Sequence, residues 1–330
     1  MIMNEVTPEH IRAACERIAG KVERTPTVLS QNLSERFGVP VHLKLEHRQT
    51  TGSFKLRGAS NAVASLSAAD KAHGVVAAST GNHGRALAHA AKLEGMRAVI
   101  CMSRLVPDNK LDEIRRLGAE MRIVGNSQDD AQREVERLVA EEGLVMLPPF
   151  DHPDIIAGQG TLGLEMIEQV PDAALVLVPL SGGGLAAGVA AAVKGLSPMA
   201  KIIGVSMARG AAMKASLDAG RPVPVEELPT LADSLGGGIG LDNRLTFAMC
   251  RDLLDDIILL GEDEIAVGIR HAYAREREIV EGAGAVGIAA LLAGKVKVSG
   301  PVVLLLSGRN IDMALHRKII CGEANAECTT

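Results

Sequence analysis

The chain has 330 residues and a formal net charge of −5, with 47% hydrophobic and 23% charged residues. This balance is typical of a folded globular protein and argues against disorder, and the length suits two lobes or one large α/β domain. The charge leaves no broad basic surface, and one Tyr, four Phe and no Trp provide few platforms for base stacking, so nucleic acid is not an expected partner.

The cysteines and the apolar runs indicate the cellular compartment. Five cysteines are scattered without CxxC spacing, which argues against a disulfide framework or a cysteine-rich zinc site. The N-terminus has no signal-peptide pattern, and no apolar run is long enough to span a bilayer. We therefore expect a cytoplasmic protein with no membrane partner.

Strand-like and helix-like runs alternate along the chain, which predicts a parallel α/β sheet architecture. The expected strands are 75–78, 98–102, 121–124, 144–147, 175–179, 201–205 and 301–306. The expected helices are 82–93, 109–117, 127–141, 262–279 and 284–292. Segment 209–243 is rich in Gly and Pro and is expected to be irregular, whereas VHLKLE (41–46) has the alternation of a half-buried strand.

These elements predict two lobes. Residues 73–147 form a compact βαβαβαβ unit that ends at Pro148-Pro149, a natural boundary. We expect this unit to be a small domain inserted into a larger one made of residues 1–72 and 148–330, with the segment 27–46 packed in the larger domain.

The segment TGSFKLRG places Lys55 in the first turn of an amphipathic helix. A lysine is poorly placed there, because the positive end of the helix dipole and desolvation both disfavour the ammonium form. An uncharged amine is a nucleophile. Lys55 is therefore a candidate catalytic residue, and an exposed lysine at a helix start is the alternative.

Three further junctions between a strand and a helix carry small polar residues. STGNHG (79–84) could present N–H groups and hydroxyls to a carboxylate, or simply cap the helix. SGGGL (181–185) could let backbone N–H groups converge on a phosphate. SGRN (307–310) follows a buried strand, a frequent ligand position in open sheets, although a turn and helix cap explains it equally.

The glycine-rich turn at 182–187 also formally matches a dinucleotide-binding fingerprint. That fingerprint requires an acidic residue about twenty positions later, to hold the ribose hydroxyls. No Asp or Glu occurs from Ala173 through Leu217. A phosphate cradle without a ribose clamp fits the sequence better, and no nucleotide P-loop motif is present.

Together, TGSFKLRGA, STGNHG, PPFDHPDIIAGQGTLGLE, VPLSGGGL, ADSLGGG, EGAGA and SGRN resemble the threonine dehydratase and serine racemase family, from about Thr25 to Asp312. This family belongs to the fold type II pyridoxal-phosphate enzymes. The resemblance implies a two-lobed, tryptophan synthase β-like α/β fold, in which each lobe is a mostly parallel sheet flanked by helices. It implies pyridoxal 5'-phosphate as cofactor, a small amino acid as substrate and a homodimer.

The resemblance also implies roles for individual residues. Lys55 would form the internal Schiff base and remove the Cα proton, with Phe54 near the cofactor ring. Asn82 would bond the ring hydroxyl, and Ser307 would face the pyridine nitrogen. Further cofactor contacts would come from Ser181, Gly182, Gly183, Gly184, Leu185 and Glu281. The substrate would contact Ser79, Thr80, Gly81, Asn82, His83 and Phe150.

Departures from the family pattern refine the prediction. Ser206 and Ala212 stand where racemase-like members carry two acidic ligands of a divalent ion, so no metal site is expected. Thr80 stands where racemases carry a serine that acts as second acid/base and dehydratases typically carry alanine, so Thr80 is a second candidate catalytic residue. Ser181 replaces the first of four family glycines, and Arg309 and Gly282 also depart from common family residues.

The expected activity is dehydration of a threonine- or serine-like β-hydroxy-amino acid to a 2-oxo acid and ammonia. A racemase is the alternative within the family. The glycine-rich run 235–243 resembles the branch linked to hydroxyectoine breakdown or to bulkier 3-hydroxy-amino acids, which is a further alternative. A non-catalytic sensor of phosphate ligands is the least favoured, because it would have no need of Lys55 at a helix start.

Overall fold

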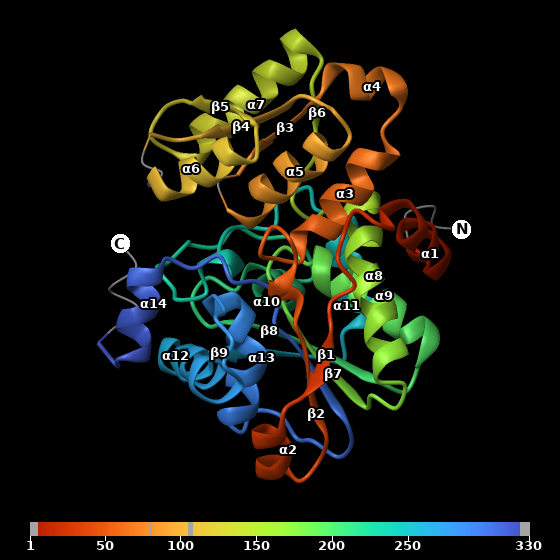
Figure 1. Cartoon of the computed structure of the whole chain (residues 1–330), viewed down its shortest axis with the longest axis vertical. Helices are drawn as coiled ribbons and strands as arrows, with labels where there is room; N and C mark the ends of the chain where they lie inside the picture. The colour runs from red at the N-terminus through yellow and green to blue at the C-terminus, as the bar shows by residue number, and fades with distance from the viewer. Residues whose placement is uncertain (1–5, 80, 105–107, 324–330) are drawn as a thin grey trace.

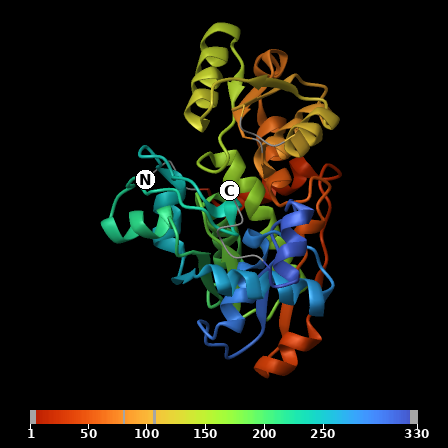
Figure 2. The same cartoon turned by 90° about the vertical axis from the view of Figure 1, so that its left-hand side faces the viewer.

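The computed structural model describes residues 6–79, 81–104 and 108–323 of the chain. Within these residues the strands form two sheets, seen one above the other in Figure 1 and Figure 2. The larger sheet has the order β1 (Thr27–Leu29), β2 (Val41–Lys44), β10 (Val302–Leu305), β7 (Leu175–Pro179), β8 (Lys201–Met207) and β9 (Asp256–Leu260). The smaller sheet has the order β5 (Glu120–Ile123), β4 (Ala98–Met102), β3 (Val75–Ala78) and β6 (Val145–Met146).

All neighbouring strands are parallel except β1 and β2 at one edge of the larger sheet. Parallel strands need crossover helices, which cover both faces of each sheet. We call the smaller sheet with its helices the small lobe, and the rest of the chain the large lobe. The predicted fold class, an α/β fold with two mostly parallel sheets, is confirmed.

Helices supply the crossovers and both outer layers. In chain order the α-helices are α1 (Pro8–Ile18), α2 (Gln31–Phe37), α3 (Lys55–Ser65), α4 (Ala68–His73), α5 (Asn82–Leu93), α6 (Asp108–Arg116), α7 (Gln128–Glu142), α8 (Pro153–Gln169), α9 (Gly184–Leu196), α10 (Ala212–Ala219), α11 (Leu245–Leu253), α12 (Glu262–His271), α13 (Gly282–Leu292) and α14 (Met313–Ile320). Short helical turns occur at η1 (Glu46–Arg48), η2 (Asp233–Leu235) and η3 (Ala272–Glu276).

Each sheet is buried on both faces. Along β7, Val176 and Val178 join one hydrophobic cluster, which includes α8 and α9, whereas Leu175 and Leu177 join another, which includes α12 and α13. This alternation follows from the two-residue period of a strand. The smaller sheet likewise separates two clusters. The near-continuous apolar runs of these strands are therefore explained by burial on both sides.

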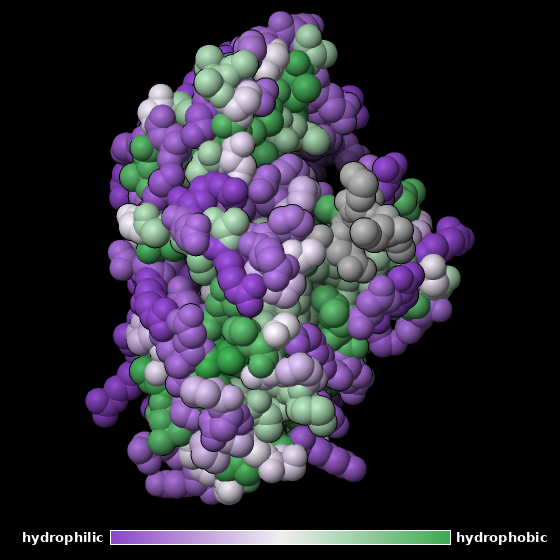
Figure 3. Space-filling view, turned by 90° about the vertical axis from the view of Figure 1, so that its right-hand side faces the viewer, coloured by the Kyte–Doolittle hydropathy of each residue, from purple (hydrophilic) through white to green (hydrophobic). Residues whose placement is uncertain are grey.

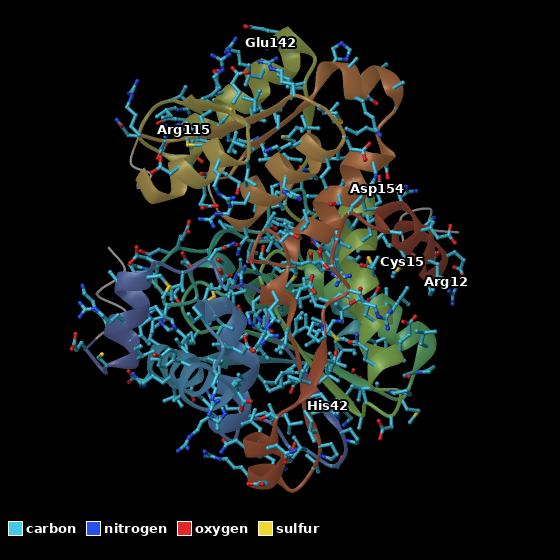
Figure 4. The ribbon with its side chains drawn as sticks, in the orientation of Figure 1. Arg12, Cys15, His42, Arg115, Glu142 and Asp154 are labelled. Carbon is cyan, nitrogen blue, oxygen red and sulfur yellow. The ribbon has the colours of Figure 1, made fainter. Side chains whose placement is uncertain are left out.

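Helix α3 joins the two lobes, because it packs against α5 in the small lobe and α8 in the large lobe. At its far end Asn61 donates to the backbone oxygen of Asp154 at 2.7 Å, and the Ser65 hydroxyl lies 3.1 Å from the Asp154 carboxylate. Figure 4 labels Asp154 at this junction, below the small lobe that carries Arg115 and Glu142. The position of Lys55 at the start of α3 is thus fixed by contacts with both lobes.

A buried cluster of charged side chains also anchors α3, through Arg57. The Arg57 guanidinium donates to Glu46 at 2.6 Å and to Glu165 at 2.6 Å, and Lys44 donates to Glu165 at 2.6 Å. Arg57 and Lys44 are almost completely buried. Thr25 donates to Glu46 at 2.7 Å and completes the cluster. Strand β2 is therefore an interior strand with a buried lysine, and the predicted half-buried strand at 41–46 was wrong in this respect.

Other predicted boundaries also need correction. Segment 209–243 contains the helix α10, whose Ala212, Met213 and Ser216 face the interior, although the Gly and Pro residues around it favoured an irregular segment. The sequence predicted one helix over 262–279. In the structure α12 ends at His271, the π-helical turn η3 follows, and Arg277, whose φ is +61°, ends the helical segment. Strands β1 and β9 and helices α1, α2, α4, α8, α11 and α14 were not predicted.

The early end of α12 has a structural reason. The Glu278 carboxylate is drawn back to His47, at 2.7 Å from its Nε2 atom, and to Arg48. Glu276 also pairs with His271 at 3.0 Å and accepts from Ser30 at 2.7 Å. These contacts with distant residues outweigh the helical preference of the segment.

No helix among the described residues is both long and apolar enough to cross a bilayer. The face drawn in Figure 3 mixes hydrophilic and hydrophobic residues.

Candidate active site

A cavity of about 350 Å³ lies where the carboxyl ends of β3, β7 and β10 approach one another. Ligands of open parallel sheets bind at this end of the strands, and the volume suits a cofactor-sized molecule. Every described residue that the sequence nominated lines the cavity: Phe54, Lys55, Ser79, Gly81, Asn82, His83, Phe150, Ser181, Gly182, Gly183, Gly184, Leu185, Glu281 and Ser307. Thr80, the remaining candidate, lies outside the described residues.

Lys55 is the first residue of α3, and its amine donates to the backbone oxygen of Pro149 at 2.8 Å. The backbone N–H of Phe54 donates to the carbonyl of Ser307 at 3.0 Å, and an isolated antiparallel bridge joins Ser53 to Gly308. These bonds attach the start of α3 to the end of β10. The Lys55 side chain therefore lines the same cavity as the glycine-rich turn.

Burial lowers the pKa of the Lys55 amine to about 8, and the nearby Glu281 carboxylate opposes this shift. A buried ammonium loses its hydration, so the uncharged form is favoured. At neutral pH the free amine is therefore much more abundant than in an exposed lysine, and it can act as a nucleophile. The Phe54 ring centroid lies 5.3 Å from the same nitrogen.

The glycine-rich turn connects β7 to α9. Gly183 adopts the left-handed region with φ of +90°, and a Cβ there would lie 2.7 Å from Met213. A Cβ at Gly182 would lie 2.4 Å from the Phe150 ring, and one at Gly184 would lie 2.9 Å from the Phe150 backbone. The turn therefore packs too closely on its far side for side chains. Its backbone lies at the positive N-terminal end of α9, where an anion is stabilised.

Asn82, Glu281 and Asn310 form a hydrogen-bonded chain between the lobes. The Asn82 amide donates to Glu281 at 2.8 Å, and the Asn310 side chain donates to Asn82 Oδ1 at 2.5 Å. The backbone N–H of Asn310 donates to Glu281 at 3.0 Å. Burial, together with the neighbouring Asp233 carboxylate, raises the pKa of Glu281 to about 7. The orientation of Asn82 in the cavity is thus set by Glu281 and Asn310, together with a longer bond of 3.4 Å to the Ser234 hydroxyl.

His83 is held in the neutral form. Burial and the positive charge of Lys55 lower the pKa of His83 to about 4. Its Nε2 lies 2.8 Å from the carbonyl oxygen of Leu147, so this nitrogen carries the hydrogen in the neutral ring. At the same loop the Gly84 N–H donates to the Ser79 hydroxyl at 3.3 Å. A carboxylate at this loop would therefore meet uncharged donors.

The cavity also has polar residues for which the sequence gave no role. Gln128, at the start of α7, donates to the carbonyl of Ala78 at 2.8 Å, and Glu227, Asp233 and Ser234 come from the large lobe. ADSLGGG was recognised as a motif, which could have pointed to Asp233 and Ser234. Gln128 and Glu227 had no sequence signal, because only tertiary packing brings them to the cavity.

One cavity thus contains a buried lysine that can lose its proton and a turn that can bind an anion. Comparisons with known proteins identify the family. The family described as pyridoxal-phosphate dependent enzyme matches residues 18–308. The chain belongs to this family. Pyridoxal phosphate is therefore its cofactor, as the sequence predicted, and the residues present fit that group.

Within this family, the sequence relatives place the chain with the threonine dehydratases. The chain is 66% identical to a Sinorhizobium fredii protein named "Putative threonine dehydratase", over 98% of this chain and 99% of the relative. It is 42% identical to the L-threonine ammonia-lyase of Thermotoga maritima, over 96% and 78%. The structure of maize serine racemase superposes with a TM-score of 0.90 at 33% identity, over 96% and 97%.

The glycine-rich turn offers a test of cofactor binding in this pyridoxal-phosphate enzyme. We expect Gly183→Ala to weaken the affinity for pyridoxal phosphate about tenfold or more, because the new Cβ meets Met213 in a strained backbone region. Titration of the apoenzyme with cofactor measures the loss. Gly220→Ala is the matched control, since Gly220 has φ of +69° but nothing within 4 Å of an added Cβ. Equal affinities for the two variants would contradict the role of the turn.

The lowered pKa of Lys55 predicts a pH dependence of cofactor capture. The uncharged amine increases as the pH rises through about 8, so the rate at which apoenzyme binds pyridoxal phosphate should rise with a midpoint there. Stopped-flow absorbance over a pH series measures this rate. Glu281→Gln should move the midpoint lower, because the carboxylate that favours the ammonium is gone. A midpoint near the ordinary lysine value of 10.5 would refute the assignment.

Proposed function

We propose that this enzyme eliminates water from a threonine- or serine-like 3-hydroxy-amino acid and releases a 2-oxo acid and ammonia. The observation that supports this most directly is the Lys55 amine, with its pKa lowered to about 8, in the same cavity as the turn Ser181–Leu185. The names of the two sequence relatives, a threonine dehydratase and an L-threonine ammonia-lyase, favour the same reaction.

Bound pyridoxal phosphate supplies an electron sink that makes the Cα proton of an attached amino acid acidic. The chain supplies positioning and proton transfer around it. Lys55 is proposed to carry the cofactor covalently and then, as a free amine, to take the Cα proton. Asn82 and Ser307 are proposed to contact the ring, and residues 181–185 to hold the phosphate.

The substrate carboxylate is proposed to bind at the loop of Ser79, Gly81, Asn82 and His83, and Phe150 forms an apolar wall of the same cavity. Thr80 remains a candidate second acid/base at this loop. The reaction loses one water and later consumes one in releasing ammonia, so the substrate and the two products balance. The proton that Lys55 takes from Cα is available for the departing β-hydroxyl, so water leaves without a further proton source.

The test is 2-oxo acid and ammonia release from purified holoenzyme with L-threonine and L-serine, with and without magnesium. We expect equal amounts of both products and no requirement for magnesium. A racemase is the second candidate, because the maize serine racemase has a closely similar structure. It would produce D-serine with little 2-oxo acid. Colourless purified protein without either activity would instead favour a non-catalytic sensor of phosphate ligands.

We further propose a substrate larger than threonine. The run 235–243 has four glycines, and one of them, Gly236, lines the cavity beside Leu235, so the wall has no side chain at this position. This run resembles the branch linked to hydroxyectoine breakdown. Higher kcat/KM for a 3-hydroxy-amino acid longer than threonine would support this proposal. We also propose that the enzyme is a cytoplasmic homodimer, and that residues 73–147 of each chain form an inserted domain.

A further inference from the structure

The wall of the cavity is strongly asymmetric in charge. Its acidic residues are Glu227, Asp233 and Glu281, and its basic residues are Lys55 and His83. His83 is neutral at physiological pH because its pKa is lowered to about 4, and Lys55 is the residue proposed to hold the cofactor. Among the described residues, no cation of the wall is left to bind a second anionic group of a substrate.

Two of these carboxylates have no cationic partner. Glu227 has no hydrogen bond or ion pair with any described residue, and Asp233 accepts only from its neighbour Ser234, at 2.8 Å from the backbone nitrogen. Arg209, from the same part of the large lobe, donates to the carbonyl of Pro229 at 3.1 Å and does not line the cavity. The negative charge of the wall is therefore not neutralised by salt bridges in the described part of the chain.

The two carboxylates lie at the same part of the rim. They come from the segment between α10 and α11, whose teal ribbon extends beside the large lobe in Figure 2, below the small lobe. Gly236 is a neighbour of this part of the wall, since a Cβ there would lie 3.4 Å from the Glu227 carboxylate and 3.1 Å from the backbone carbonyl of Asp233. Because Glu227, Asp233 and Gly236 all line the cavity, a substrate side chain that extends to this part of the wall would approach carboxylates.

We infer that the cavity selects 3-hydroxy-amino acids whose side chain is neutral or ends in an ammonium group, and rejects those with a second carboxylate. The inference rests on the proposed dehydratase function and adds the charge class of the substrate. Opposite charges attract and like charges repel with an energy that falls with distance and solvent screening. Because Glu227 and Asp233 are exposed, each contributes a several-fold preference.

A ligand of the favoured class is 2,4-diamino-3-hydroxybutanoate. Loss of its hydroxyl as water, followed by hydrolysis, gives 4-amino-2-oxobutanoate and one ammonia, so the atoms balance as they do for threonine. Its side chain carries an ammonium group on the γ-carbon, where threonine has only a methyl group. It is therefore longer than the threonine side chain by one polar atom. This reach suits a wall opened by Gly236 and lined by carboxylates.

The experiment compares kcat/KM of the holoenzyme for L-threonine, 2,4-diamino-3-hydroxybutanoate and 3-hydroxyaspartate by ammonia release. The change in visible absorbance on adding each compound measures its binding separately. We expect the diamino acid to exceed 3-hydroxyaspartate at least about tenfold in both measurements, with the difference shrinking at high salt. Equal or better use of 3-hydroxyaspartate would overturn the inference.

Glu227→Gln should lower the ratio of diamino acid to threonine about fivefold, and Glu227→Lys should reverse the preference in favour of 3-hydroxyaspartate. Glu226→Gln is the matched control, because Glu226 is exposed, adjacent and outside the cavity wall. Ratios that do not change in either Glu227 variant would also overturn the inference. If no compound releases ammonia, the proposed dehydratase function fails, and the binding ratios still decide the charge preference.

Discussion

Replacement of Lys55 by alanine is expected to lower turnover about a thousandfold or more and to remove the visible absorbance of the bound cofactor at the same time. Both losses have one cause, because the same amine is proposed to hold the cofactor covalently and to take the Cα proton. The amine points into the cavity from the first turn of α3, with its pKa lowered to about 8. No other lysine lines the cavity wall among the described residues.

Turnover and the absorption spectrum of the Lys55→Ala variant, purified with added pyridoxal phosphate, measure the two effects. Lys92→Ala is the control, since Lys92 is exposed near the end of α5. A small primary amine added to the Lys55→Ala enzyme should restore part of the activity, because it replaces the missing base without a change of fold. Retained turnover in the unsupplemented variant would contradict the assignment of Lys55.

The sequence predicted the parts of the site that depend on local pattern. Parallel strands followed by small polar residues predicted the turn at Gly182, Gly183 and Gly184, and the amphipathic run after Lys55 predicted the start of α3. These features could be predicted because backbone geometry at a strand-to-helix junction is set within a few residues. Their convergence on one cavity followed from the general rule for open sheets.

The parts that the sequence did not predict depend on contacts between distant segments. Gln128 and Glu227 reach the cavity only because the two lobes face each other, and neither belongs to a recognisable motif. The end of α12 depends on the pairing of Glu278 with His47, which are far apart in the chain. A single-sequence pattern carries no information about such long-range pairs.

Arg57 is the clearest case of a residue whose role the pattern concealed. An arginine in a helix is normally read as a surface residue, yet its guanidinium is almost completely buried between two carboxylates. It lies two residues after Lys55 on α3 and ties this helix to η1 through Glu46 and to α8 through Glu165. The site therefore depends on a charge cluster outside the cavity.

Arg57→Ala should destabilise the fold by about 3–5 kcal/mol, because removal of one partner leaves the other charge buried without compensation. Glu46 would be the residue most affected. Its remaining side-chain hydrogen bond comes from Thr25, whereas Glu165 keeps Lys44. Urea denaturation of the apoenzyme, with the free energy extrapolated to water, measures the change. Arg97→Ala is the control, since Arg97 pairs with Glu120 and Glu142 at the surface and should cost about 1 kcal/mol or less.

The double variant Arg57→Met with Glu46→Leu separates the loss of a charge pair from the loss of packing. It removes both Arg57 and the carboxylate left unpaired in the single variant, and it keeps the Glu165 pair with Lys44. We expect it to be more stable than Arg57→Ala by about 1–3 kcal/mol, because apolar side chains replace buried ions at lower desolvation cost. A double variant no more stable than the single one would mean that packing and the hydrogen bonds of Arg57 to Thr161 and the Glu23 carbonyl, rather than charge compensation, hold α3 in place.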